Sequence, residues 1–110
     1  MNLVTPRSYL NNSKLYFSKS ELTKILNCYA IGVSKGSWKD YAIDFSKNEA
    51  NFLIYKHSWA SPDCILSKLK ERKRKKITYK LSISNKKYKN FNNIDELISS
   101  LKRKQIKLIT

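Results

Sequence analysis

The sequence is poor in the residues that build flexible loops, cross-links and metal centres. It holds two Gly, two Pro, two Cys and a single His among 110 residues. The scarcity of Gly excludes a glycine-rich phosphate loop and a flexible Gly/Ser linker. Because the chain lacks several histidines and clustered carboxylates, we expect no zinc site, no two-metal site and no cofactor.

The two cysteines and the apolar segments indicate a compartment. Cys28 and Cys64 are far apart in the sequence and form no C-x-x-C pair. We expect two reduced, buried thiols, with a disulfide as the alternative. The first residues show no apolar segment of the signal-peptide type, and no stretch approaches the ~18 apolar residues of a membrane span. These features predict a cytoplasmic protein.

Few side chains could carry out catalysis. His57, the only histidine, stands between Lys and Ser at the end of a strand pattern, which is typical of a surface residue. A Cys/His pair would need Cys28 or Cys64 to meet it, and Cys28 lies within a helix pattern that faces the core. Asp40 and Asp44 share a strand face, more typical of a solvated surface than of a cation site. The sequence therefore predicts a protein that is not an enzyme.

The composition indicates a folded domain. Hydrophobic residues make up 41% of the chain, with seven Tyr, four Phe and two Trp, whereas disordered basic chains are poor in aromatics. We expect residues 1–15 to form an extended arm, which can be mobile, and residues 16–110 to form a single α+β domain.

The first clear element is a helix. Ser18 and Glu21 have the S-x-x-E spacing of a capping box. Behind them apolar residues recur every three or four positions, and Gly36 is a natural left-handed stop. This pattern predicts a helix from Lys19 to about Lys35.

From Lys39 the apolar period changes to two, which is the period of a strand. Strand patterns occupy residues 39–45, 52–55, 64–70, 77–83 and 88–91. A second helix pattern follows Asn92 or Asn93, and residues 105–110 fit either its end or a last extended piece. The sequence thus predicts an α+β fold: an N-terminal helix, an antiparallel meander of four to five strands, and a C-terminal helix, with both helices packed on one sheet face.

Most of the chain resembles a known family. The helix start at Phe17 and the segment from Trp38 to Phe45 are similar to a family of small bacterial proteins, of alphaproteobacterial type, classed as a domain of unknown function (DUF2794-like). The similarity continues through residues 52–56 and 62–79 and covers roughly residues 17–109. The resemblance implies a single-domain fold and brings no activity and no site residues.

Positive charge is concentrated in the second half of the chain. The formal net charge is +15, and residues 64–107 carry fifteen Lys/Arg against three acids. Lys, Asn and Ile together supply 40 of the 110 residues, so a compositional bias towards AT-rich codons is an alternative source of the charge. Its concentration in one half is less easily explained in that way.

Five basic residues are consecutive from Arg72 to Lys76, and only Glu71 lies close enough to neutralise them. Lys is a point charge that binds phosphate without reading bases, so the pattern predicts electrostatic binding of RNA or another nucleic acid, including RNA within a ribonucleoprotein. The order of elements is also that of the double-stranded-RNA-binding domain. The candidate nucleic-acid-binding residues are Lys68, Lys70, Arg72, Lys73, Arg74, Lys75, Lys76, Lys80, Lys86 and Lys87.

Other interpretations remain open. The basic segment could be a solvated loop, could dock an acidic protein partner, or could approach an anionic membrane surface. Trp38 and Trp59 could stack a base, although large rings more often seal the seam between helix and sheet. The solvent face of the sheet should show a continuous basic surface under the RNA interpretation and a contiguous apolar patch under the adaptor interpretation.

Overall fold

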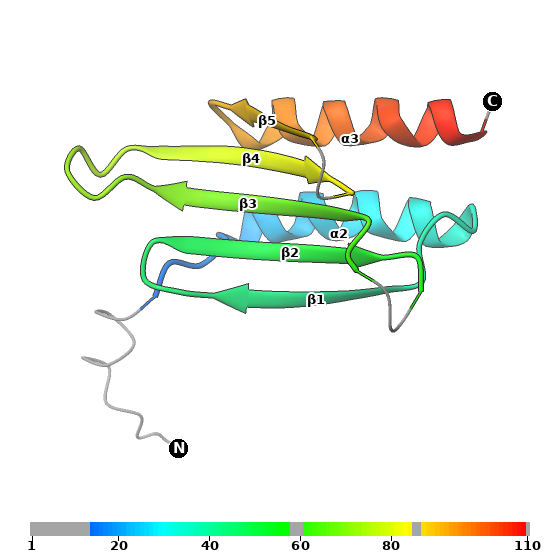
Figure 1. Ribbon diagram of the computed structural model, residues 1–110, viewed down its shortest axis with the longest axis horizontal. Helices are drawn as coiled ribbons and strands as arrows, with labels where there is room; N and C mark the ends of the chain where they lie inside the picture. Colours follow the sequence, from blue (N-terminus) through cyan, green and yellow to red (C-terminus); the bar gives the residue numbers. More distant parts are fainter. Residues whose placement is uncertain (1–13, 58–60, 85–86, 110) are drawn as a thin grey trace, which may run out of the picture.

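A computed structural model describes residues 14–57, 61–84 and 87–109. The chain forms helix α2 (Lys19–Ser34), five strands and helix α3 (Ile94–Ile109) (Figure 1). The strands form one antiparallel sheet in the order β1-β2-β3-β4-β5, with bounds β1 (Asp40–Phe45), β2 (Glu49–Tyr55), β3 (Cys64–Lys70), β4 (Ile77–Ile83) and β5 (Lys87–Phe91). The predicted α+β fold, with an antiparallel meander of four to five strands, is confirmed, and the meander has five strands.

Helix α2 begins with the predicted capping box. The Ser18 hydroxyl accepts a hydrogen bond from the Glu21 amide (3.1 Å), and the Ser18 amide donates to Glu21 Oε1 (2.8 Å). Two otherwise unpaired amides are thereby satisfied at the helix start. The helix ends at Ser34, and Gly36 adopts the left-handed conformation with φ +80°. The position of this helix therefore follows from local sequence signals.

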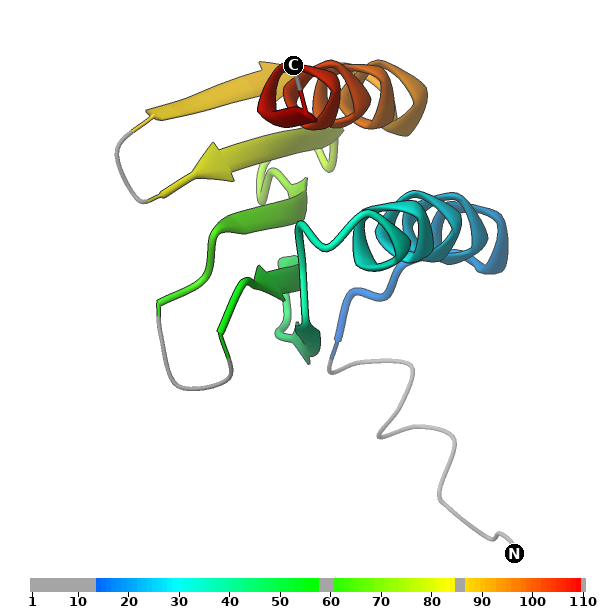
Figure 2. The same cartoon turned by 90° about the vertical axis from the view of Figure 1, so that its right-hand side faces the viewer.

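The two helices cover one face of the sheet (Figure 2). The register sets which side chains face them, because residues paired across strands share a face. Phe52 pairs with Leu66, and Leu66 with Leu81, and all three are almost completely buried. Helix residues complete the core: Ile25, Cys28, Ile94, Leu97, Ile98 and Leu101.

The start of β2 differs from the prediction, and the end of α3 decides between the two alternatives that the sequence left open. Strand β2 begins at Glu49, three residues earlier than predicted, because Ala50 pairs with both Phe45 and Lys68 and is fully buried. Helix α3 extends to Ile109, so residues 105–109 are helical. Its cap is Asn93, whose Oδ1 accepts a hydrogen bond from the Glu96 amide (2.9 Å).

The two cysteines and Trp38 belong to the buried core. Both cysteines are free and buried, as predicted, and burial raises the pKa of the Cys64 thiol to about 12. Trp38 is 2% exposed, stacks on Tyr29 with 6.2 Å between ring centroids, and donates to Asp63 Oδ2 (3.2 Å). It therefore seals the helix-sheet seam, whereas Trp59 lies outside the described residues.

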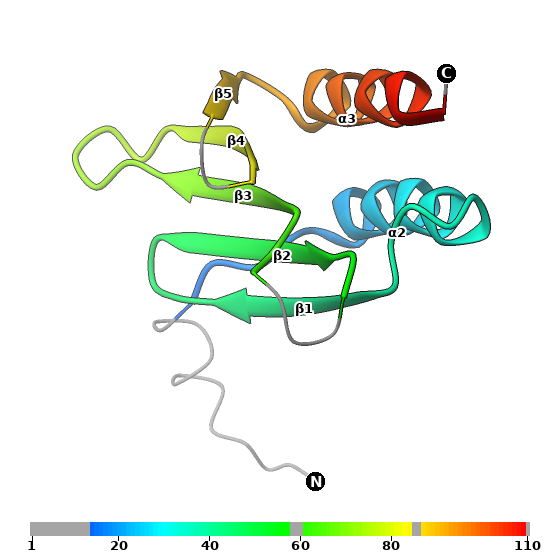
Figure 3. The same ribbon diagram turned by 45° about the vertical axis from the view of Figure 1, so that its right-hand side comes forward.

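In this meander, successive connections between strands lie at alternate ends of the sheet. The β1–β2 turn and the β3–β4 loop lie at one end, which we call the hairpin end (Figure 3). The other two connections lie at the opposite end, because consecutive turns of a meander alternate. None of the helices that the structure describes is long and apolar enough to cross a membrane.

Candidate nucleic-acid interface

The β3–β4 loop holds its charges on a fixed backbone. The Glu71 amide donates to the Lys76 carbonyl (2.9 Å), and the Lys75 amide donates to the Glu71 carbonyl (2.8 Å). Lys75 has a φ of +56°, a left-handed conformation that L-residues rarely adopt outside tight turns. The four residues between Glu71 and Lys76 thus form a closed loop with its side chains exposed.

Most of the loop cations have no acidic partner. Arg74 binds Glu71 through two hydrogen bonds of 2.5 and 3.1 Å, which lower the pKa of Glu71. Within the described residues, no carboxylate forms an ion pair with Arg72, Lys73, Lys75 or Lys76. Uncompensated like charges repel one another, so this loop favours an external anion.

The hairpin end contains a hollow of about 440 Å³, which we call the basic hollow. Three segments surround it: the residues before α2, the β1–β2 turn and the β3–β4 loop. Two backbone hydrogen bonds join them, from Leu15 N–H to the Ser46 carbonyl (2.8 Å) and from Lys70 N–H to the Asn48 carbonyl (2.9 Å). The hollow is lined by Lys14, Leu15, Lys47, Asn48, Lys70, Glu71, Arg72 and Lys75.

The charge of this hollow is strongly unbalanced. Five of its eight lining residues are cations, and its one carboxylate, Glu71, is already engaged by Arg74. None of the five cations forms an ion pair with another described residue. A concave site of this composition can hold a phosphate or another compact anion.

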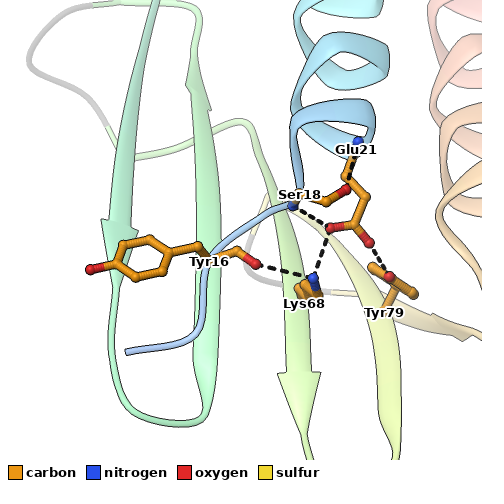
Figure 4. A network of polar contacts seen from close by, with 5 residues as sticks. All are labelled: Tyr16, Ser18, Glu21, Lys68 and Tyr79. Atoms are coloured by element: carbon orange, nitrogen blue, oxygen red, sulfur yellow. Dashed lines mark hydrogen bonds and ion pairs between the residues drawn. The ribbon is translucent and has the colours of Figure 1, made fainter. Parts of the chain in front are cut away.

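Lys68 lies apart from this surface, contrary to the sequence-based expectation. It occupies the helix-covered face of β3, where its Nζ donates to Glu21 Oε1 (2.8 Å) and to the Tyr16 carbonyl (3.0 Å) (Figure 4). Its side chain is 13% exposed. The reason is electrostatic, since Lys68 neutralises a carboxylate that is itself buried.

Tyr79 completes this network by donating its hydroxyl to Glu21 (Figure 4). Burial disfavours ionisation of Glu21, but the hydrogen bonds from Lys68, Tyr79 and the Ser18 amide outweigh it and lower the pKa of Glu21. Burial and the bond to Glu21 raise the pKa of Tyr79. The network therefore ties α2 to β3 and β4.

Other predicted residues are distributed along the sheet. Lys80 projects from the face opposite the helices, where its Nζ lies 5.6 Å from the centroid of the Tyr88 ring. Lys87 pairs with Ile83 at the far end of β4 from the loop, a separation of about 20 Å at ~3.3 Å per residue. Contrary to expectation, Lys87 does not join the loop cations, and Lys86 lies outside the described residues.

The open face of the sheet is neither basic throughout nor a contiguous apolar patch. This face, which bears Ala42, Leu53, Ile65, Ser82 and Tyr88 in one paired row, is acidic over its first two strands. Its charged residues are Asp40, Asp44, Glu49 and Lys80. The face as a whole therefore does not separate the RNA and adaptor interpretations, and the hairpin end carries the positive charge.

Sequence reasoning missed two cations of the basic hollow, Lys14 and Lys47. The predicted meander could have placed Lys47 near the basic loop, because the first and third turns of a meander lie at the same end of the sheet. No local pattern placed Lys14, which reaches the hollow through the bond between Leu15 and Ser46. Among the described residues, no group of three His, Cys, Asp or Glu side chains could hold a metal ion.

Comparison with known proteins gives one family. Neither the curated proteins nor the solved structures yield a significant match. Residues 15–94, which span the first helix, the sheet and the cap of α3, match the model of the family described as "Protein of unknown function (DUF2794)". The match covers well over half of the chain, and the protein belongs to the DUF2794 family.

Proposed function

We propose that this protein is a non-enzymatic cytoplasmic domain that binds RNA, or another nucleic acid, through phosphate contacts at the hairpin end. The observation that carries the proposal is the basic hollow, in which five cations surround about 440 Å³ without an available carboxylate. Lys73 and Lys76 extend the charge along the same loop.

The physical reason is the relief of repulsion. Cations held close together by a closed loop cannot separate, and a bound phosphate neutralises them while the polyanion releases its own counterions. Because the loop backbone is already ordered by the bonds between Glu71, Lys75 and Lys76, little conformational entropy is lost on binding. A mostly Lys surface binds phosphates without reading sequence.

The test is a titration with structured RNA and with duplex DNA at several salt concentrations. In the hollow variant, Gln replaces Lys47, Lys70 and Arg72. In the matched variant, Gln replaces Lys35, Lys39 and Lys102, which are exposed residues outside the basic hollow. Both variants lose three charges. We expect the salt slope to flatten by about 0.9 per lost phosphate contact in the hollow variant only.

Two outcomes contradict the proposal. If both variants weaken binding equally, net charge and not the hollow attracts the nucleic acid. If the wild type binds no nucleic acid at low salt, the loop is solvated surface. The adaptor interpretation makes a different prediction: polyglutamate of matched charge should then compete as well as RNA for the hollow.

A further inference from the structure

Tyr88 is the most exposed of the large apolar side chains in the described part of the chain, with an exposed fraction of 70%. It lies on β5 and pairs with Ser82, which places it on the open face of the sheet, away from the helices. It belongs to neither the core nor the group of residues packed against it. Its ring does have one charged neighbour, the Lys80 ammonium, which lies 5.6 Å from the ring centroid. This contact does not bury the ring, so core packing does not explain an aromatic residue here.

A second feature lies on the same face. A shallow hollow of about 230 Å³ is lined by eight residues: Asp44, Glu49, Asn51, Leu53, Ile65, Ser67, Lys80 and Ser82. The Ser67 hydroxyl donates to Asn51 Oδ1 (2.6 Å), which leaves the Asn51 amide protons available as donors. Leu53 and Ile65 supply apolar surface among these polar groups, a composition that suits a flat ring with polar edges.

The distribution of charge on the open face favours one path for a polyanion over another. Asp40, Asp44 and Glu49 make the β1–β2 half acidic, and they would repel phosphates. Among the described residues of β4 and β5, Lys80 is the charged residue on this face, and β4 leads directly from Lys76 of the basic loop. A phosphate chain that leaves the hairpin end is thus favoured along β4 and disfavoured across β1 and β2.

We propose that the nucleic acid of this site is single-stranded, and that it runs from the hairpin end along β4 with one base stacked on Tyr88. A neighbouring base lies beside Lys80, at the β4 side of the shallow hollow, so that its phosphate stays away from Asp44 and Glu49. This inference rests on the proposed function and specifies its ligand. Duplex recognition needs only phosphate contacts, whereas an exposed aromatic ring on a sheet face binds bases that are unpaired and free to stack.

The experiment compares an oligouridylate of about 12 nucleotides with an RNA duplex of the same length, measured by fluorescence anisotropy. The variants are Tyr88→Ala, Tyr88→Phe and Lys80→Gln, with Lys102→Gln as the control that removes one charge from the surface of α3. Because Tyr88 is so exposed, its substitution should leave the circular dichroism spectrum and melting temperature unchanged.

We expect Tyr88→Ala to weaken oligouridylate binding about tenfold, and Tyr88→Phe to bind like the wild type, because stacking needs the ring and not the hydroxyl. Lys80→Gln should weaken it more than Lys102→Gln does. The affinity of Tyr88→Ala for the duplex should stay unchanged.

The outcomes separate this inference from the function on which it rests. If Tyr88→Ala binds oligouridylate as the wild type does, while the hollow variant loses affinity, the single-strand inference is overturned and phosphate binding at the hairpin end stands. If the duplex binds more tightly than oligouridylate, the inference is overturned in the same way. If the wild type binds neither, both proposals fail.

Discussion

Glu21 satisfies two requirements at once. As the third residue of α2 it closes the capping box, and its carboxylate also accepts hydrogen bonds from Lys68 of β3 and Tyr79 of β4. Lys68 in turn donates to the Tyr16 carbonyl, so one carboxylate fixes the start of α2 against two strands (Figure 4). A buried ion pair contributes little net stability compared with apolar packing, but the loss of one partner is costly because the other charge remains buried.

Replacement of Glu21 by Gln should therefore destabilise the fold by about 2–3 kcal/mol, somewhat less than for a fully buried pair because the two side chains are 12–13% exposed. The double variant Glu21→Gln/Lys68→Met should recover part of this loss, since no uncompensated cation remains. Urea unfolding of the wild type and the variants measures both effects. A double variant less stable than Glu21→Gln alone would contradict this account of the pair.

The same pair predicts a pH dependence. The folded-state pKa of Glu21 lies below its ordinary value of 4.5, so its stabilising contribution is complete above that value and is lost as the pH falls through the folded-state pKa. The difference in unfolding free energy between the wild type and Glu21→Gln should thus be constant from pH 7 to about pH 5 and shrink towards pH 3. Comparison with this variant cancels the other carboxylates. A gap that stayed constant down to pH 3 would show that the Glu21 charge does not contribute.

At the scale of the elements, the β3–β4 hairpin has a strained residue within its charged loop. Lys75 has φ +56°, a conformation that Asn and Gly adopt more readily than Lys. Lys75→Asn should raise the free energy of unfolding by about 0.5–1 kcal/mol while weakening polyanion binding.

Lys73→Asn is the matched control, because it removes the same charge from a residue outside the left-handed region. Thermal unfolding and RNA titration of both variants test the relation between strain and binding. An equal stability gain in both variants would mean that relief of charge repulsion, and not of backbone strain, is responsible.

The elements differ in how far local sequence determines them. Strands β3 and β4 could be predicted from alternation bounded by turn residues, and α2 from its capping box. The start of β2 could not, because Ala50 carries little apolar surface and is recruited into the core by pairing with β1 and β3. Alternation along β3 puts Lys68 on the same face as Leu66, but its partner Glu21 is 47 residues away, and only the packing of α2 shows that they meet.

At the scale of the whole molecule, charge and topology separate the surface into regions. The formal net charge is +15. Repulsion among its cationic side chains lowers the free energy of unfolding at low ionic strength. Helix α2 is anchored near the hairpin end through Glu21 and Lys68, whereas Asp63, just before β3, binds Lys104 of α3 (3.4 Å) at the other end of the sheet. Glu21 and Asp63 thus hold the two helices on the sheet, and the hairpin end is left with cations that pair with no described carboxylate.

This separation predicts that compact anions stabilise the protein beyond the effect of screening. Pyrophosphate should raise the free energy of unfolding by about 1 kcal/mol when its concentration is about five times its Kd, a shift of about 4 °C or more in Tm. Sodium chloride at the same ionic strength should give a smaller shift, because it screens the charges without bridging them.

The variant with Lys47, Lys70 and Arg72 replaced by Gln should lose the difference between the two salts, and the matched variant at Lys35, Lys39 and Lys102 should retain it. Thermal melts monitored by circular dichroism measure the wild type and both variants in each of the two salts. Equal shifts for pyrophosphate and chloride in the wild type would show that the five cations act as a diffuse positive field. A difference confined to proteins with an intact hollow would show that the converging turns of a meander make a discrete anion site.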